Sequence, residues 1–287
     1  MQLYALDSDR LITARHAEKQ RDYSCLECGS AVRLRRGIQR QPHFYHLDAP
    51  RHCHLNGKSF AHLHTQLLLQ ESLPKGDCFL EYRFPEIQRI ADVVWWSQKL
   101  IFEVQCSFIS SEEIQARQKD YASLGFHVIW ILHDARYNRR KLSAAELILE
   151  GQSVYFTNMN ADGQGEIYDQ LDLYVSGTRI KLIEKQIIDL KGLHRTDLKE
   201  TGTLPFKIPT GLQKRLSSWP LSLYGDLINQ TWFNACDELF VKQLEHAHEI
   251  ETMHKDTAEE RKRGRSWKGV LKHAYRVCLH AFLERVG

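Results

Sequence analysis

The hydrophobic and polar positions between residues 59 and 132 alternate with the periods of helices and strands in turn. Helical stretches begin at Ser59 and at the capping box Ser110-x-x-Glu113. Four apolar stretches of strand length accompany them, and a short polar turn joins the second and third into a hairpin. The predicted strands are 78–84, 90–96, 100–106 and 126–132. The pattern therefore predicts an α/β domain with the element order α-β-β-β-α-β.

Two of the predicted strands each carry an acidic residue where an apolar residue would pack better. These residues are Asp92 and Glu103, and the hairpin places them on adjacent strands. Burying a carboxylate costs several kcal/mol unless a cation or a hydrogen-bond donor meets it. The pair therefore predicts a site for Mg²⁺ or Mn²⁺, with the carbonyl of Val104 as a third ligand. The alternative is a pair of solvent-facing acids on an edge hairpin.

The same periodicities place other polar residues near this pair. Gln105 lies two residues after Glu103 and shares its strand face, so it is a candidate for orienting the attacking water or the phosphate. Glu81, on the preceding strand, is a candidate third acid, unless a neighbouring arginine pairs with it on the surface. His62 and Gln66 lie one helical turn apart and could face the same site. For His62, a partly exposed helix histidine is the alternative.

Composition divides the chain into three regions. Residues 1–58 are rich in Cys, His and Arg, and predict a zinc-binding module of two or three strands that is too small for a large core. Residues 59–165 form the α/β domain. Residues 166–287 predict a C-terminal, mainly helical domain. Within it we expect a linker at 201–220. Two helices follow, at 223–243 and 267–285.

The first region contains a pattern of metal-ligating residues. Cys25-x-x-Cys28, a gap of fourteen residues, and then His43-x-x-His46 have the ligand types and spacing of a tetrahedral zinc site. Replacement ligands close by in the chain are His52, Cys53 and His54. Four protein ligands leave no open position, so this Zn²⁺ is expected to be structural. The alternative is a reduced, buried thiol pair with ordinary histidines.

Charge is unevenly distributed along the chain. The 287 residues carry a net charge of only +3, which does not by itself indicate a nucleic-acid binder. Eight basic residues face three acidic ones in residues 10–40, and nine face four in residues 255–287. Such segments either contact phosphates or form a solvated face. The candidate DNA-binding residues of the first segment are Arg33, Arg35 and Arg36.

The sequence also limits where the protein acts. No apolar run approaches the roughly 20 residues that cross a bilayer. The first ten residues lack the basic and apolar regions of a signal peptide. We therefore expect a cytoplasmic protein with no membrane partner. The seven cysteines are an odd number and three of them lie between Cys25 and Cys53, which favours metal ligation over disulfides.

Several short motifs recur together along the α/β domain. They are Arg89-Ile-Ala-Asp-Val93, Phe102-Glu-Val-Gln-Cys-Ser107, Ile109-Ser110, Arg117, Tyr121 and Val128-Ile-Trp-Ile-Leu132. Together they resemble the competence protein CoiA family, as do the Cys-x-x-Cys and His-x-x-His motifs that precede the first helix. The resemblance covers about residues 25–135. It implies a PD-(D/E)XK, restriction-endonuclease-like core.

The resemblance also implies roles for individual residues. Asp92 and Glu103 would be the metal ligands, and Gln105 would occupy the position where a lysine is usual. Glutamine can form hydrogen bonds there but brings no positive charge. Three further residues match the family pattern: Ser107, Arg117 and Tyr121. The last two share one helix face and could reach a phosphate, or could pack the helix on the sheet.

We therefore expect a deoxyribonuclease that depends on Mg²⁺ or Mn²⁺ and carries a structural Zn²⁺. The resemblance implies that it processes incoming DNA, single-stranded or branched, for recombination during natural transformation. Recombination proteins are further candidate partners. Two alternatives stay open. One is a DNA-binding recombination mediator with a catalytically weak site, because position 105 lacks the lysine. The other is a defence-type nuclease with the same core.

Overall fold

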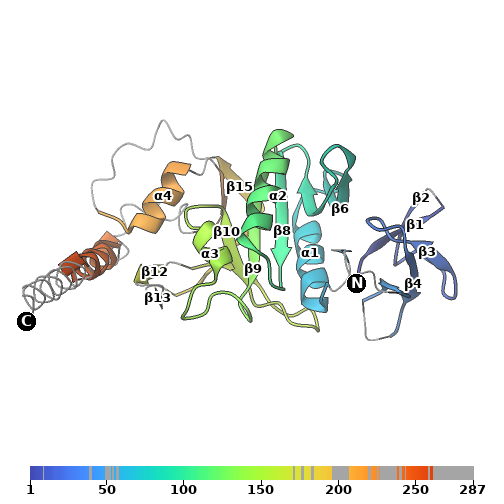
Figure 1. Cartoon of the computed structure of the whole chain (residues 1–287), viewed down its shortest axis with the longest axis horizontal. Helices are drawn as coiled ribbons and strands as arrows, with labels where there is room; N and C mark the ends of the chain where they lie inside the picture. The colour runs from blue at the N-terminus through green and yellow to red at the C-terminus, as the bar shows by residue number, and fades with distance from the viewer. Residues whose placement is uncertain are drawn as a thin grey trace, which may run out of the picture.

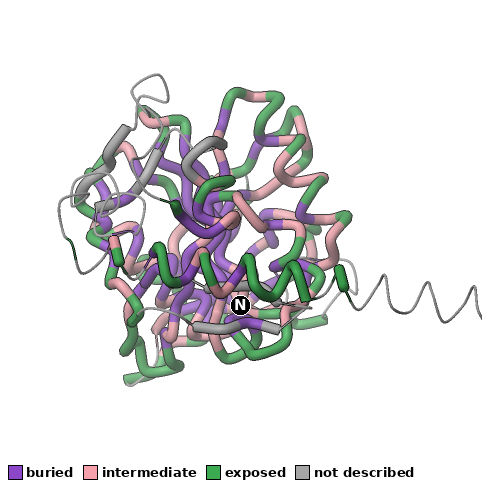
Figure 2. Tube along the Cα trace, turned by 90° about the vertical axis from the view of Figure 1, so that its left-hand side faces the viewer, coloured by how far each residue is buried: buried purple, intermediate pink, exposed green. Residues whose placement is uncertain are grey.

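The computed structural model describes the chain in residues 1–8, 10–38, 41–48, 53, 55, 58–170, 172–175, 178–181, 184–195, 207–218, 221–224, 226, 238, 241–242, 244–257 and 259–260. Figure 1 shows the N-terminal sheet next to the larger central sheet along the long axis of the molecule, and helices pack on the central sheet. Figure 2 shows the buried positions gathered along the strands at the centre of the molecule.

The N-terminal residues form a five-stranded antiparallel sheet. Its strands are β1 (Tyr4–Asp7), β2 (Arg10–Thr13), β3 (Asp22–Ser24), β4 (Ala31–Arg35) and β5 (His43–His46). Their spatial order is β2-β1-β3-β4-β5. The core of this sheet is small and includes Ala5, Val32 and Phe44. The sheet has more strands than the two or three that we expected, because β1 and β2 are only four residues long and show little periodicity.

The central sheet has seven strands and mixed directions. Its members are β6 (Cys78–Phe84), β7 (Arg89–Trp95), β8 (Leu100–Gln105), β9 (His127–His133), β10 (Val154–Thr157), β11 (Ile167–Asp169) and β14 (Gln186–Ile187). They lie in the order β14-β11-β10-β9-β8-β7-β6. The strands from β6 to β8 are antiparallel, whereas β9 runs parallel to both β8 and β10. A single turn of 3₁₀-helix, η1 (Pro85–Ile87), joins β6 to β7.

Helices cover both faces of this sheet. The helix α1 (Phe60–Ser72) packs through Leu63 and Leu69 into the same core cluster as Phe102, on one face. The helix α2 (Ser111–Ser123) and the short helix α3 (Ala144–Ile148) belong to the cluster that contains Ile101, on the other face. Ser59 and Ser110 cap α1 and α2 as the sequence predicted. The expected order α-β-β-β-α-β is therefore observed from α1 to β9.

The C-terminal part differs from the expected, mainly helical domain. Strands β12 (Asp172–Val175) and β13 (Thr178–Lys181) form one hairpin, and β15 (Asp189–Arg195) pairs with β16 (Leu221–Tyr224). The helix α4 (Thr210–Ser218) lies within the segment expected to be a linker. The sequence also predicted helix from residue 223, where β16 instead pairs with a strand almost thirty residues earlier, a relation that local periodicity does not reveal.

Two other expectations concern this part of the chain. Residues 244–257 are helical, and Leu244 joins the core cluster of the α1 face. The helix predicted at 267–285 lies outside the described residues. The three domain boundaries stay predictions. The central sheet itself continues past residue 165, through β11 and β14.

Candidate active site and metal cluster

Three acidic residues form a row across three neighbouring strands of the central sheet. The regular pairing of β7 with β8 ends at Val93 and Phe102, and Val93 also pairs with Leu80 of β6. The next position on each strand carries an acid, and these acids are Glu81, Asp92 and Glu103. All three are buried, with exposed fractions of 3%, 6% and 3%. This burial excludes the alternative of solvent-facing acids on an edge hairpin.

The carboxylate of Asp92 is surrounded by hydrogen-bond donors. Its Oδ1 atom accepts from Lys58 Nζ at 2.7 Å and from Gln66 Nε2 at 3.0 Å, and lies 3.0 Å from His62 Nε2. Its Oδ2 atom accepts from the backbone N–H of Val104 at 2.9 Å. Burial alone would raise the pKa of Asp92, but His62 and the Lys58 ammonium beside it hold this pKa well below its ordinary value. Asp92 is therefore ionised.

Glu103 is held from the opposite face of the sheet. Its Oε2 atom accepts from the Arg117 guanidinium at 2.9 Å and its Oε1 atom accepts from the Tyr121 hydroxyl at 2.7 Å. Both partners lie on α2. Burial raises the pKa of Glu103 to about 7, because it outweighs the opposing charge of Arg117, and the nearby Asp92 charge adds to the increase. Arg117 and Tyr121, the residues of α2 that were predicted to reach a phosphate, thus position the carboxylate of Glu103.

Glu81 adopts an unusual backbone conformation. Its φ angle is +47°, in the left-handed region that non-glycine residues seldom adopt and that concentrates at functional sites. Its Oε2 atom accepts from the backbone N–H groups of Leu3 and Tyr4 at 3.0 and 3.1 Å. Its Oε1 atom accepts from Lys58 at 3.2 Å. Glu81 therefore links the first strand of the N-terminal sheet to the acidic row.

Lys58 is the residue of this site that the sequence did not single out. Its ammonium bridges Asp92 and Glu81, and the side chain is only 8% exposed. Burial would lower the pKa of Lys58, but the two carboxylates raise it above the ordinary value, so the ammonium stays protonated. The position just before Ser59, the residue that caps α1, was the available signal, because it places a side chain at the same helix end as His62.

An open cavity of about 570 Å³ gives access to the acidic row. Asp92, Glu103 and Lys58 line it, together with Arg117 and Gln105. Residues of the N-terminal region and of the loop after β8 complete the wall, and they include Glu27, Leu55, Ser107 and Phe108. The two carboxylates and the two cations thus face a space large enough to admit part of a substrate.

Gln105 braces the loop that follows β8. Its Nε2 atom donates to the carbonyl and the hydroxyl of Ser107, at 2.8 and 3.1 Å. The same carbonyl accepts from the Tyr137 hydroxyl at 2.6 Å. Gln105 therefore fixes the wall of the cavity, and the structure places Ser107 in that wall.

Four metal-ligating side chains meet in the N-terminal region. They are Cys25, Cys28, His46 and Cys53, and their ligand atoms all lie within 4.8 Å of one another. The Sγ atoms of Cys25 and Cys53 are 3.7 Å apart, and Cys28 Sγ lies 3.3 Å from His46 Nε2. Zn–S bonds of about 2.3 Å in a tetrahedron separate two sulfurs by roughly 3.8 Å. The cluster therefore has the ligand types and spacing to hold a metal ion such as zinc.

This cluster corrects one of the predicted ligands. His43 does not belong to it, and Cys53, named as a substitute, takes the fourth position. The two histidines stand three residues apart on β5, so the two-residue period of a strand directs them to opposite faces. His43 is buried against Phe60, with its Nδ1 atom 2.9 Å from the carbonyl of Gln41. The other proposed substitutes, His52 and His54, lie outside the described residues.

Comparison with known families agrees with this division of the chain. Residues 6–56 match the family model described as the competence protein CoiA, N-terminal domain. Residues 52–168 match the model described as the competence protein CoiA, nuclease-like domain. The chain belongs to the competence protein CoiA family. No curated protein and no solved structure matches it.

The nuclease-like match of this CoiA-family chain includes the whole acidic row, and the N-terminal match includes all four clustered ligands. The fourth, Cys53, lies in the stretch that both matches share. Among the described helices, none is both long and apolar enough to pass through a lipid bilayer.

The predicted DNA-binding arginines of the N-terminal sheet already have partners in this CoiA-family structure. Arg36 donates to the carbonyls of Ala14 and Ala17 at 2.7 and 3.2 Å, so it holds a loop together. Arg33 pairs with Asp22 at 2.7 Å. Arg35 stacks over the ring of Tyr45 at 4.6 Å. Arg40, at the end of the basic segment 10–40, and residues 261–287 of the basic segment 255–287 lie outside the described residues, and DNA binding by these segments stays a prediction.

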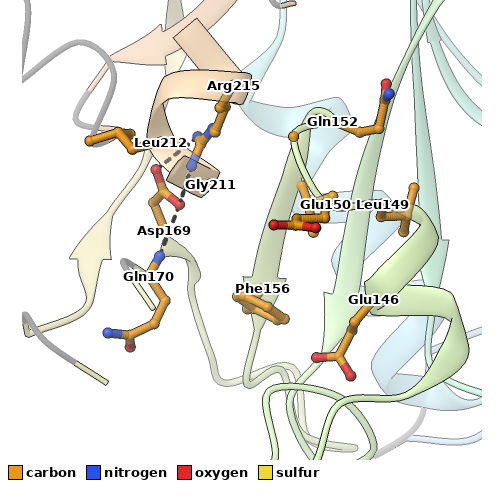
Figure 3. Close-up of a pocket in the computed structure, with 12 residues that line it drawn as sticks. Glu146, Leu149, Glu150, Gln152, Phe156, Asp169, Gln170, Gly211, Leu212 and Arg215 are labelled. Carbon is orange, nitrogen blue, oxygen red and sulfur yellow. Dashed lines mark hydrogen bonds and ion pairs between the residues drawn. The ribbon is translucent and has the colours of Figure 1, made fainter. Parts of the chain in front are cut away.

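A second, smaller hollow lies near α4 (Figure 3) and has a volume of about 80 Å³. Its polar wall is an ion pair in which both terminal nitrogens of Arg215 meet the two carboxylate oxygens of Asp169, each at 2.9 Å. The pair fastens α4 to the end of β11. We assign it a structural role, since the carboxylate and the guanidinium satisfy one another and the hollow is small.

Proposed function

We propose that this CoiA-family protein is a deoxyribonuclease of the PD-(D/E)XK type that depends on Mg²⁺ or Mn²⁺. Its substrate would be incoming DNA, single-stranded or branched, processed for recombination during natural transformation. The observation that carries the proposal is the row of three buried carboxylates, two of which, Asp92 and Glu103, line an open cavity. Isolated buried acids are costly, and such clusters concentrate at functional sites.

The arrangement of the elements supports this assignment. The acids stand where β7 and β8 stop pairing, and Asp92 occupies the gap by accepting from the Val104 N–H. The side chains that position Asp92 come from α1, and those that position Glu103 come from α2. Two helices on opposite faces of the sheet are therefore needed to build one site. That requirement is expected of a catalytic centre and is not needed for packing alone.

The residues present fit a hard divalent cation. Mg²⁺ prefers carboxylate and carbonyl oxygens, and Asp92 and Glu103 would hold it, with the Val104 carbonyl as a third ligand. The Lys58 ammonium lies between two of the carboxylates, which marks the position as favourable for positive charge. The amide oxygen of Gln66 is buried beside Asp92 without a hydrogen-bond partner among the described residues. When bound, such an ion lowers the pKa of water and neutralises charge on the phosphate.

The other residues of the site would act on the substrate. Arg117 lines the cavity, and its guanidinium is shared between Glu103 and Glu113, at 2.9 Å from each. A guanidinium in this position suits the binding of a phosphate oxygen. Gln105 holds the Ser107 carbonyl and thereby fixes the loop against which the DNA would lie. A rigid wall keeps the scissile bond in line with the attacking water.

The Cys25, Cys28, His46 and Cys53 cluster would hold a structural Zn²⁺. Glu27, between the two cysteines of the first motif, accepts from the backbone N–H of Leu55 at 2.9 Å, and both residues line the cavity. A metal at the cluster would therefore stiffen the part of the cavity wall that the N-terminal region provides.

A DNA-binding recombination mediator with a catalytically weak site is the second candidate. One observation favours it: every carboxylate oxygen of Asp92 and Glu103 already lies within hydrogen-bond distance of a protein partner. A divalent ion would have to displace some of these donors. A defence-type nuclease would use the same site, and the genes that surround this one would separate it from a transformation protein.

One experiment separates cleavage from binding. Labelled single-stranded and double-stranded DNA are incubated with the protein in Mg²⁺, in Mn²⁺ and in EDTA, and both the products and the bound fraction are measured. The nuclease proposal predicts cleavage that requires the metal and is lost in Asp92→Asn. Binding of DNA without cleavage under all three conditions would support the mediator instead.

A further inference from the structure

We propose that Lys58 supplies the phosphate-binding positive charge that position 105 lacks. The inference rests on the proposed function, since it names the group that meets the DNA backbone in the same site. Position 105 holds a glutamine, and its amide is committed to the Ser107 loop. The positive charge must therefore come from another element. Lys58 immediately precedes Ser59, the residue that caps α1, and its side chain extends from there to the acidic row.

The geometry places the ammonium at the reaction centre. Lys58 Nζ lies 2.7 Å from Asp92 Oδ1 and 3.2 Å from Glu81 Oε1. The residue also lines the 570 Å³ cavity together with Asp92, Glu103 and Arg117. A lysine that only neutralised two buried acids could lie behind them, away from the space. Lys58 instead contributes to the cavity lining, so a molecule in the cavity can contact it.

The charges of the site favour this role. Three carboxylates, Glu81, Asp92 and Glu103, stand beside the cations Lys58 and Arg117, and the Arg117 guanidinium is shared with Glu113. A divalent ion held by Asp92 and Glu103 would offset the carboxylate charge, so that the Lys58 ammonium could meet a phosphate oxygen instead. Without Lys58, the site would present one cation fewer to the DNA backbone.

Two anchors fix the approach of Lys58. On one side Ser59 Oγ accepts from the backbone N–H of His62 at 3.2 Å, which begins α1. On the other side Leu55 is held by Glu27 at 2.9 Å, and Cys53 belongs to the proposed zinc cluster. The cap at Ser59 therefore fixes the backbone that directly follows Lys58. A lysine stem allows the ammonium to leave Asp92 for a phosphate oxygen without a movement of the backbone.

The test compares Lys58→Gln, Gln105→Lys and the double variant Lys58→Gln with Gln105→Lys. Lys75→Gln is the matched control, because Lys75 is an exposed lysine at the opposite end of α1. Binding of a single-stranded oligonucleotide is measured over a range of salt concentrations in Ca²⁺, and the cleavage rate is measured in Mg²⁺. Each phosphate contact contributes about 0.7 to the slope of log affinity against log salt for single strands.

We expect Lys58→Gln to lower this slope by about one phosphate contact and to reduce the cleavage rate at least tenfold. The double variant should recover the salt slope but only part of the cleavage rate, because it loses the Gln105 amide that braces the Ser107 loop, and Lys75→Gln should change neither. Because Lys58→Gln leaves two buried acids without their ammonium, Lys58→Gln with Glu81→Gln is measured beside it, to keep the charge balance if the single variant does not fold. An unchanged salt slope in a folded Lys58 variant would overturn the inference.

The two proposals fail separately in this design. If the wild type cleaves no DNA but Lys58→Gln still lowers the salt slope, Lys58 binds phosphate and the nuclease assignment is wrong. If the wild type cleaves DNA and Lys58→Gln cleaves equally well with the same slope, the nuclease assignment stands and Lys58 is only a structural counter-ion.

Discussion

The carboxylate of Asp92 accepts a hydrogen bond from the backbone N–H of Val104, 2.9 Å away on the next strand. A side chain here takes the place of a backbone partner, because the regular pairing of β7 with β8 stops one residue earlier. Asp92 is thereby held beside the backbone of Val104, the residue that follows Glu103. As a result, donors from α1 on one face of the sheet and from α2 on the other face contact neighbouring carboxylates, Asp92 and Glu103, in one site.

The metal cluster of the N-terminal region gives the first prediction. Cys53→Ser should lose bound zinc and unfold this region, whereas His43→Asn should keep about one zinc per chain. The reason is that Cys53 belongs to the cluster and His43 does not. Structural zinc contributes on the order of 10 kcal/mol to such a module. Elemental analysis of protein purified without chelators measures the zinc, and loss of zinc in His43→Asn alone would contradict the assignment.

Gln105→Ala should slow cleavage by loosening the cavity wall. The variant removes the donor to the Ser107 carbonyl and hydroxyl, so residues 106–110 should exchange their amide hydrogens faster. We expect the rate to fall by about tenfold, as for the loss of one or two positioning hydrogen bonds, with metal affinity unchanged. Exchange measured by mass spectrometry and cleavage measured on the same sample check this. A wild-type rate together with faster exchange would remove the loop from the mechanism.

Stability should depend on pH through Glu103. The folded state raises the pKa of this group from 4.5 to about 7, chiefly by burial. The folded protein then binds the proton more tightly than the unfolded chain, so the stability that the protonated group provides is lost as the pH rises from 4.5 through 7. Glu103→Gln should therefore gain on the order of 2 kcal/mol relative to the wild type between pH 5 and pH 8 in EDTA.

Denaturant unfolding at these two pH values measures the difference, and Glu112→Gln on the exposed side of α2 is the control. Taking the difference between variant and wild type removes effects common to both, such as protonation of the zinc-cluster histidine. A difference that does not change with pH would show that Arg117 keeps Glu103 ionised throughout this range.

Arg36 and Arg33 should differ in what their loss does. Arg36→Ala should destabilise the N-terminal sheet by about 2 kcal/mol or more, because its guanidinium donates to carbonyls of the loop after β2. Arg33→Ala should cost less than about 1 kcal/mol, since its pair with Asp22 is exposed to solvent. Thermal unfolding compares the two variants. Equal and small effects on stability would show that Arg36 does not hold the loop in place, and Arg36 would then stay a candidate DNA-binding residue.

The sequence predicted the central part of the fold because its signals are local. The strands that carry Asp92 and Glu103 are apolar runs bounded by turns, and Ser59 and Ser110 are visible caps. Adjacent strands in a hairpin must place such acids side by side. The neighbouring positions of the two carboxylates therefore followed from periodicity, their burial indicated a divalent-metal site, and the family resemblance added the nuclease assignment.

What the sequence did not reveal depends on contacts between distant segments. Lys58 reaches Asp92 across 34 residues, and its position before the Ser59 cap indicates only at which helix end it lies, not that Asp92 is its partner. The strand β16 forms only against β15, so its residues looked helical in isolation. The choice of Cys53 over His43 was different, because the two-residue period of β5 already placed His43 and His46 on opposite faces.

The most direct test of the proposed nuclease is the metal-dependent cleavage of single-stranded DNA by the wild type and by Asp92→Asn. The substitution keeps the shape of the side chain and removes the charge that Lys58 and a divalent ion require. We predict cleavage by the wild type in Mg²⁺ or Mn²⁺, none in EDTA, and a loss on the order of a hundredfold or more in Asp92→Asn, with DNA binding retained. Cleavage by Asp92→Asn at the wild-type rate would contradict the account.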